Sequence, residues 1–230
     1  MSRPDLAVTR EWVRAGTEFF LREAAVDLGR PSVLPGWTGA HLAAHVARNA
    51  EALGRLATWA RTGIETPMYE SPARRDEEIE ESSHRSSSAL RAEVESTAAD
   101  LEKALDLLDG PALASEVRSA RGRLIPATEI PWLRVREVWL HAVDLGASID
   151  DLPADLVDAL LDDVTESFTG RAPALLLRPA DRDRTWQIPG DDDPRPVDGT
   201  AAALLSWLTG RAVGKDLDAD GPLPDLPHWL

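Results

Sequence analysis

Two short segments that lie far apart in the chain carry side chains of the kind that bind metal ions. His41 and His45 occupy the first segment, and Glu137 and His141 occupy the second. In each pair the residues are four positions apart, about one turn of an α-helix, so they lie on the same helix face. Glu137 and His141 can therefore bind one cation together. A third ligand must come from elsewhere, and the first segment offers one.

His45 is the better third ligand of the first pair. It shares an apolar helical stripe with Leu42 and Val46, the face expected to turn inward, whereas His41 lies at the edge of that stripe. With the second pair, His45 makes a set of two histidines and one carboxylate. Such a set leaves at least one coordination position open, which suits a metal that acts on a ligand more than one that only holds a fold.

The alternative is that these residues are ordinary core and surface side chains. A histidine on an apolar face is more often a hydrogen-bonded core residue, and a Glu–His pair four apart also forms common surface contacts. Two observations favour the metal site. The chain has only five histidines, and the other two, His84 and His228, lie in polar or proline-rich surroundings. Glu137 is flanked by Val138 and Trp139, and a carboxylate buried there needs a partner.

The amino-acid composition excludes several classes of chemistry. The chain has 230 residues, a net charge of −15 and no cysteine. It therefore has no disulfide, no thiolate zinc site and no cysteine nucleophile of its own. The acidic balance argues against binding nucleic acid or an anionic membrane surface, because both require basic side chains. An anionic substrate would have to be met by a local cluster of arginines.

No segment has the pattern of an export signal or a membrane span. Residues 1–10 lack the apolar core of a signal peptide, and no apolar stretch approaches the length needed to cross a bilayer. We therefore expect a cytoplasmic protein that does not associate with membranes, and we expect it to be a monomer.

Hydrophobic periodicity predicts an α+β protein with two domains. Four long amphipathic helices are expected at about 5–26, 38–61, 87–109 and 127–146, and they predict a four-helix bundle within residues 1–149. Residues 150–230 predict a small α+β domain. Its expected elements are a helix at 152–168, strands at 174–177 and 185–188, a helix through Trp207 and an extended tail.

The connection between the second and third bundle helices, residues 63–86, is longer than a bundle requires. It is rich in proline, serine and charge, and its run 74–80 predicts a short helix. The charges of that run are most simply a solvated face. A connection of this length can also fold over one end of a bundle and cover a site.

Several motifs together resemble those of the mycothiol-dependent maleylpyruvate isomerases. Residues 36–38 lead to 45–50, and residues 136–146 carry the Glu-x-x-x-His element; both are shared by the wider DinB-like metal-dependent superfamily, which includes thiol transferases. The Thr-Pro-Met-Tyr element at 66–69, followed by Arg75 and Ile79, is narrower and indicates the isomerase. The closing residues 227–230 are also similar, so the resemblance covers essentially the whole chain.

The resemblance implies roles for particular residues on a DinB-like bundle. The metal ligands of the family fall on His45, Glu137 and His141, and zinc is the expected metal. Two arginines of the family's active site match Arg75 and Arg211, so both are candidate catalytic residues that would bind the carboxylates of a substrate. Asn49, one turn beyond His45, is a candidate for cofactor binding, with plain core packing as the alternative. For Arg211 the alternative is that it caps its own helix.

The resemblance also implies a reaction, the cis-to-trans conversion of maleylpyruvate to fumarylpyruvate in gentisate breakdown. A thiolate adds to the conjugated double bond, the resulting single bond turns, and elimination of the thiol restores the double bond. Because the chain has no cysteine, mycothiol would supply the thiol, and zinc would hold it as thiolate. The two carboxylates of the substrate would pair with Arg75 and Arg211.

Two other functions remain open at the level of the sequence. One is a mycothiol S-transferase that conjugates electrophiles or xenobiotics and does not return the thiol. The other is a non-catalytic zinc-bearing binding module. The two arginines discriminate among these functions, because neither alternative needs Arg75 and Arg211 to gather at the metal.

Overall fold

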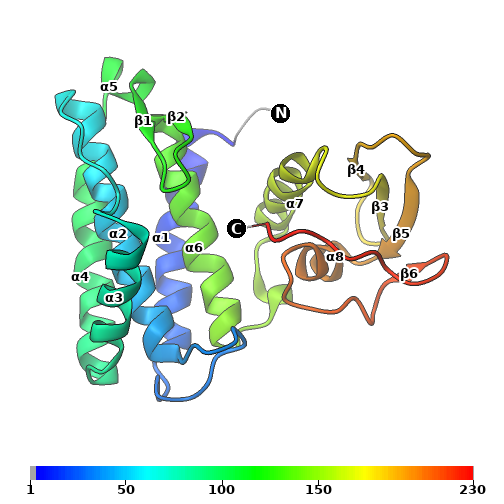
Figure 1. Cartoon of the computed structure of the whole chain (residues 1–230), viewed down its shortest axis with the longest axis horizontal. Helices are drawn as coiled ribbons and strands as arrows, with labels where there is room; N and C mark the ends of the chain where they lie inside the picture. The colour runs from blue at the N-terminus through cyan, green and yellow to red at the C-terminus, as the bar shows by residue number, and fades with distance from the viewer. Residues whose placement is uncertain (1–3, 230) are drawn as a thin grey trace. The chain divides into compact units, whose positions relative to one another are not determined.

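The computed structural model describes residues 4–229, so the start of the amino-terminal segment and the final Leu230 lie outside the described part. The chain forms two compact units, one of Asp5–Ala147 and one that begins at Ser148. The first unit is built mainly of helices, and the second combines helices with a small sheet (Figure 1). Among the described residues, none of the helices combines the length and the apolar character that crossing a bilayer requires.

The four predicted long helices form the framework of the first unit. They are α1 (Leu6–Glu23), α2 (Gly39–Thr62), α4 (Ser87–Asp106) and α6 (Ile130–Leu145). In this bundle α2 packs against α4 and α6, and α1 packs against α6. The result places α2 and α6, which carry the two predicted metal-binding segments, next to each other.

Local sequence signals explain where α2 begins and ends. Its amino-terminal residue follows Thr38, whose extended backbone starts the helix, and Gly63 ends it with a φ of 72°. Glycine suits that position because side chains disfavour a positive φ. The inward face of α2 consists of small and branched apolar residues, among them Leu42, Leu53 and Leu56, which have no exposed surface.

Close contact between α1 and α6 holds α6 in place. A Cβ added at Gly16 of α1 would lie 2.5 Å from Nε1 of Trp139, so only glycine permits this approach. The Trp139 indole donates a hydrogen bond of 2.9 Å to the carbonyl oxygen of Trp12. The ring of Phe19 lies 5.1 Å from that of Trp139. These contacts set the rotation of α6, and with it the direction in which Glu137 and His141 point.

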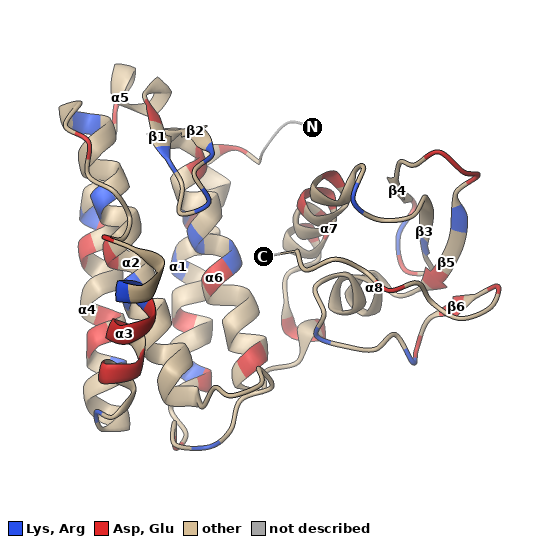
Figure 2. Cartoon of the chain, in the orientation of Figure 1, with Lys and Arg blue, Asp and Glu red and all other residues tan. Residues whose placement is uncertain are grey.

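The long connection after α2 contains the predicted short helix, which is α3 (Pro72–Ser83). The hydroxyl of Ser71 accepts a hydrogen bond from the backbone N–H of Arg74 and caps the helix. Acidic and basic residues follow one another along α3 (Figure 2), as expected of a solvated helix. Its buried apolar residue, Ile79, anchors it, and α3 packs along α2.

Some short elements of the first unit were not predicted. They are α5 (Gly110–Ala114), the antiparallel hairpin of β1 (Glu116–Arg118) and β2 (Leu124–Pro126), and the 3₁₀ turn η1 (Ala127–Glu129). Strands of three residues are too short to show an alternating pattern. Their single inward residues, Val117 and Ile125, are nevertheless completely buried at one end of the bundle.

The second unit consists of two helices and a four-stranded sheet. After the turn η2 (Ile149–Asp151) its elements are α7 (Ala154–Phe168), β3 (Leu175–Pro179), β4 (Trp186–Ile188), β5 (Arg195–Gly199), α8 (Ala201–Leu208) and β6 (Asp218–Ala219). The strand order is β4-β3-β5-β6, with β3 and β5 parallel. Both predicted strands are present. The sequence did not predict β5, because Pro196, its second residue, is untypical of a strand between two others.

Candidate metal centre and active site

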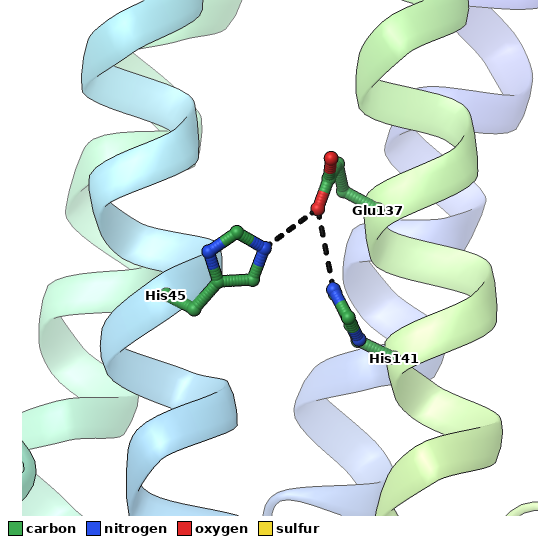
Figure 3. Close-up of side chains that lie close together, drawn as sticks. All are labelled: His45, Glu137 and His141. Carbon is green, nitrogen blue, oxygen red and sulfur yellow. Dashed lines mark hydrogen bonds and ion pairs between the residues drawn. The ribbon is translucent and has the colours of Figure 1, made fainter. Parts of the chain in front are cut away.

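The helices α2 and α6 direct three potential metal ligands at one another (Figure 3). His45 comes from α2, and Glu137 and His141 come from adjacent turns of α6. One nitrogen or oxygen atom from each residue can be chosen so that all three atoms lie within 4.8 Å of one another. Three ligand atoms this close to one another could hold a single cation between them.

A single carboxylate oxygen lies at the middle of the cluster. Oε2 of Glu137 is 2.8 Å from Nε2 of His45 and 3.3 Å from Nε2 of His141. The two imidazole rings meet edge to face, with their centroids 4.8 Å apart and an angle of 87° between their planes. Both histidines therefore turn the same ring nitrogen toward the carboxylate, although they come from different helices.

The electrostatics of the cluster reflect burial and mutual pairing. Burial lowers the pKa of His45, and the attraction of Glu137 does not fully offset that effect. Burial would raise the pKa of Glu137, but the two histidines outweigh it and hold the pKa well below its usual value. Burial would lower the pKa of His141, but its hydrogen bonds to Asp144 and Glu137 outweigh burial and raise the pKa overall. Glu137 is thus kept as a carboxylate, the form that binds metal ions.

The second ring nitrogen of His141 contacts another carboxylate. Nδ1 of His141 lies 2.8 Å from Oδ2 of Asp144, one turn further along α6. Asp144 is only 1% exposed. Asp144 was not among the predicted site residues. A signal was available, because an aspartate three positions after a ligand histidine shares its helix face.

The second ring nitrogen of His45 contacts a guanidinium. Nη2 of Arg75, on α3, lies 3.1 Å from Nδ1 of His45. The same guanidinium donates to Asp76 at 2.8 Å and lies over the ring of Tyr69, 5.8 Å from its centroid. Burial is the main cause that raises the pKa of Tyr69, so its hydroxyl stays protonated. The structure therefore brings the predicted Arg75 to the cluster, at the point where α3 passes along α2.

His41 has a different environment, in accord with its place at the edge of the stripe. Its Nδ1 accepts a hydrogen bond of 3.2 Å from the backbone N–H of Thr38 and lies 2.8 Å from the Thr38 hydroxyl. Its Nε2 lies 3.1 Å from Oε2 of Glu80 on α3. Both ring nitrogens are thus used at the start of α2, where His41 caps the helix.

Asn49 lies in the bundle core, one turn beyond His45. Its Oδ1 accepts a hydrogen bond of 3.0 Å from Nη1 of Arg134, which also donates to the carbonyl of Val46 at 2.6 Å. Arg134 is completely buried, and burial lowers its pKa to about 10. This contact joins α6 to α2 and is consistent with the core-packing alternative for Asn49. The sequence analysis did not predict a role for Arg134.

Arg211 belongs to the second unit and follows α8. Its backbone N–H donates to the carbonyl of Ser206 at 2.8 Å, and its Nη1 donates to the carbonyl of Thr209 at 3.2 Å. Both contacts lie at the end of its own helix, as the capping alternative expected. Its predicted role in binding a substrate stays a prediction.

Comparisons with known proteins identify relatives of both units. Residues 6–146 match the family described as the mycothiol maleylpyruvate isomerase N-terminal domain, and residues 151–228 match the MDMPI C-terminal domain. Two solved structures, of a mycothiol-dependent maleylpyruvate isomerase and of a histidine-to-alanine mutant, each share 35% sequence identity with this chain. Each match covers 100% of both chains with a TM-score of 0.91. A search of curated proteins found no match.

Proposed function

Because this chain belongs to the mycothiol maleylpyruvate isomerase family, we propose that it catalyses the mycothiol-dependent conversion of maleylpyruvate to fumarylpyruvate. The conversion changes only the geometry of one double bond. Substrate and product contain the same atoms, and the thiol that adds to the double bond is returned when it leaves. The absence of cysteine from the chain supports the need for an external thiol.

The observation that carries the proposal is the convergence of His45, Glu137 and His141 from two helices. Two histidines and one carboxylate are a typical ligand set for a catalytic zinc ion with an open position. Burying an ionised carboxylate is costly unless a cation or several donors compensate it, and a metal at this point would supply that compensation. These three residues are therefore proposed to hold one zinc ion. When bound, zinc would stabilise the thiol sulfur as a thiolate.

The remaining task for the protein is to bind a substrate with two carboxylates. At a net charge of −15 the molecule repels a dianion at long range, so fixed positive charge is needed close to the centre. Arg75 supports this role, because its guanidinium lies beside His45 and its side chain is 29% exposed. A planar guanidinium can bind a carboxylate through two parallel hydrogen bonds. Arg211 is proposed as the second such group.

The test is an assay of maleylpyruvate turnover with zinc-loaded protein, with and without mycothiol. We expect isomerisation that requires both, that stops after chelation of the metal and that resumes when zinc is returned. The concentration of mycothiol should not fall during turnover. Consumption of one thiol per substrate molecule would instead identify an S-transferase, and zinc binding without reaction would identify a binding module.

Several finer statements extend this proposal. We infer a cytoplasmic, monomeric enzyme. Its first domain ends at residue 149 and its second begins at residue 150. Asn49 takes part in cofactor binding. Gel filtration tests the monomer, and limited proteolysis tests the boundary. A loss of mycothiol affinity in Asn49→Ala, at unchanged zinc content, would support the role of Asn49.

A further inference from the structure

Asp144 forms a contact that the proposed reaction does not use. Its Oδ2 lies 2.8 Å from Nδ1 of His141, and its side chain has no exposed surface. On the opposite side of the same imidazole, Nε2 lies 3.3 Å from Oε2 of Glu137. The ring of His141 is therefore held between two carboxylates, and only the one from Glu137 belongs to the proposed metal ligands.

The contact with Asp144 determines which nitrogen of His141 carries the proton. A carboxylate oxygen faces each ring nitrogen, but Nδ1 lies 2.8 Å from Asp144 whereas Nε2 lies 3.3 Å from Glu137. The shorter contact identifies Nδ1 as the donor and Oδ2 of Asp144 as the acceptor. In the neutral ring the proton then resides on Nδ1, and the lone pair resides on Nε2. Nε2 is the nitrogen directed at Glu137. The contact thus leaves the metal-binding lone pair on the side where the other two ligands lie.

Packing alone does not explain why a carboxylate occupies position 144 of α6. Asp144 is 1% exposed, and the nearby residues Leu140 and Ala142 of the same helix are also buried. Burying a carboxylate costs far more than burying an apolar side chain of the same size. An apolar residue would fill this place at lower cost, whereas only an acceptor can orient the His141 ring.

We propose that Asp144 is a positioning residue that holds His141 in the tautomer and the orientation required for binding the metal ion. The inference rests on the metal centre proposed above. It assigns to Asp144 no contact with substrate, thiol or metal. Partners of this kind, placed behind ligand histidines, typically change metal affinity by about 10- to 100-fold when removed.

The first experiment compares zinc affinity in wild type and Asp144→Asn, measured by competition with a chromophoric chelator. Asparagine has nearly the same size but no charge, and its amide can also present a donor to the ring. We expect zinc to bind about 10- to 100-fold more weakly. An unchanged affinity in a folded Asp144→Asn protein would overturn the proposal.

A matched control separates positioning from general stability. Asp163 is a buried aspartate of α7, in the other unit, with 6% exposure. We expect Asp163→Asn to lower the melting temperature of the metal-free protein without changing zinc affinity. For Asp144→Asn the affinity loss should exceed what the melting temperature of the metal-free protein accounts for. A purely structural role would make the two variants behave alike.

A second measurement needs no variant at position 144 and no metal. Nitrogen-15 spectra of the imidazole rings report directly which nitrogen is protonated, and His141→Gln identifies the His141 signals by their loss. In metal-free wild type, at a pH where the ring is neutral, we expect the proton on Nδ1. A proton on Nε2 would refute the role of Asp144. If wild type failed to bind zinc, the proposed metal centre would fall, while the tautomer would still decide this inference.

Discussion

His45 and His141 differ in what faces the ring nitrogen turned away from the candidate centre. Nδ1 of His141 meets the carboxylate of Asp144, an acceptor on the same helix. Nδ1 of His45 meets the guanidinium of Arg75, a donor on a different helix. Because a guanidinium cannot accept a hydrogen bond, Nδ1 of His45 must be the acceptor in this arrangement. The proton of the His45 ring then resides on Nε2, directed at Glu137.

The difference shows that the two sides of the centre are prepared for a metal to different degrees. On the α6 side, the proposed contact with Asp144 leaves the lone pair of His141 directed at the candidate centre. On the α2 side, a metal on Nε2 of His45 requires that nitrogen to lose its proton, and a proton on Nδ1 would then face the guanidinium of Arg75. Metal binding should therefore separate Arg75 from His45, which leaves Arg75 available for a carboxylate.

The largest effect is expected where the two sides meet, at Glu137. Glu137→Gln removes the charge that both histidines share, and we expect zinc affinity to fall by more than about 100-fold, beyond the effect typical of residues that only support a ligand. Turnover should fall to background. Metal analysis and the maleylpyruvate assay measure both effects. Glu102→Gln, which alters an exposed ion pair with Arg14, is the control; a normal metal content in Glu137→Gln would rule out this ligand.

Substitution of Arg211 tests whether residues of the helical bundle suffice for catalysis without the second unit. If it binds substrate, Arg211→Ala should cut turnover by about 100-fold, the order expected for losing one charged hydrogen-bond donor in a transition state. Zinc content and melting temperature should change little. Arg211→Lys should recover only part of the activity, because an ammonium cannot reproduce the planar fork.

The control for this experiment is Arg178→Ala, which removes an exposed arginine of the same unit that pairs with Asp198 at 2.8 Å. It should retain full turnover. Wild-type activity in Arg211→Ala would leave Arg211 as a helix cap and restrict the candidate site to the bundle.

Arg75→Ala provides the sharpest contrast with Asp144→Asn, because the two changes should move zinc affinity in opposite directions. Removing Arg75 eliminates a charged hydrogen bond that competes with the metal-bound form of His45. We expect zinc to bind about 3- to 10-fold more tightly, on the order of one such bond. Turnover should nevertheless fall, because the substitution removes the guanidinium that would bind a carboxylate of the substrate.

The control is Arg74→Ala on the same helix, where Arg74 forms surface ion pairs with Glu77 and Glu78 at 3.3 and 3.2 Å. Arg74→Ala should change neither zinc affinity nor turnover. Weaker zinc binding in Arg75→Ala would show that Arg75 supports His45 as Asp144 is proposed to support His141, and the asymmetry would be lost.

The smallest effect on catalysis is expected at His41, the other histidine of the first segment. His41→Ala removes the acceptor for the Thr38 N–H and should cost about 0.5–2 kcal/mol of stability, as loss of a helix cap does. Turnover and zinc content should remain close to wild type, in contrast to their loss in His45→Ala. Thermal melting and the turnover assay separate the two outcomes; equal loss of activity in both variants would make His41 a ligand.

Residues of one helix could be related to one another from the sequence alone. The i, i+4 spacing of Glu137 and His141 and the apolar stripe around His45 follow from helical periodicity, and both remain visible in the folded bundle. The long helices and the strands β3 and β4 were predictable for the same reason. The hairpin β1–β2 was not, because strands of three residues are too short to show an alternating pattern. Strand β5 was not, because Pro196 is untypical of a strand that lies between two others.

The sequence by itself determined the types of ligand available, the absence of an internal thiol and the helices that carry each ligand. Only the tertiary structure decided which group lies behind His45. Asp144 faces His141 within one helix, but Arg75 reaches His45 only because α3 packs along α2. Arg134 likewise contacts Asn49 only because α6 packs against α2. Periodicity determines the face on which a side chain lies, whereas helix packing determines what that face meets.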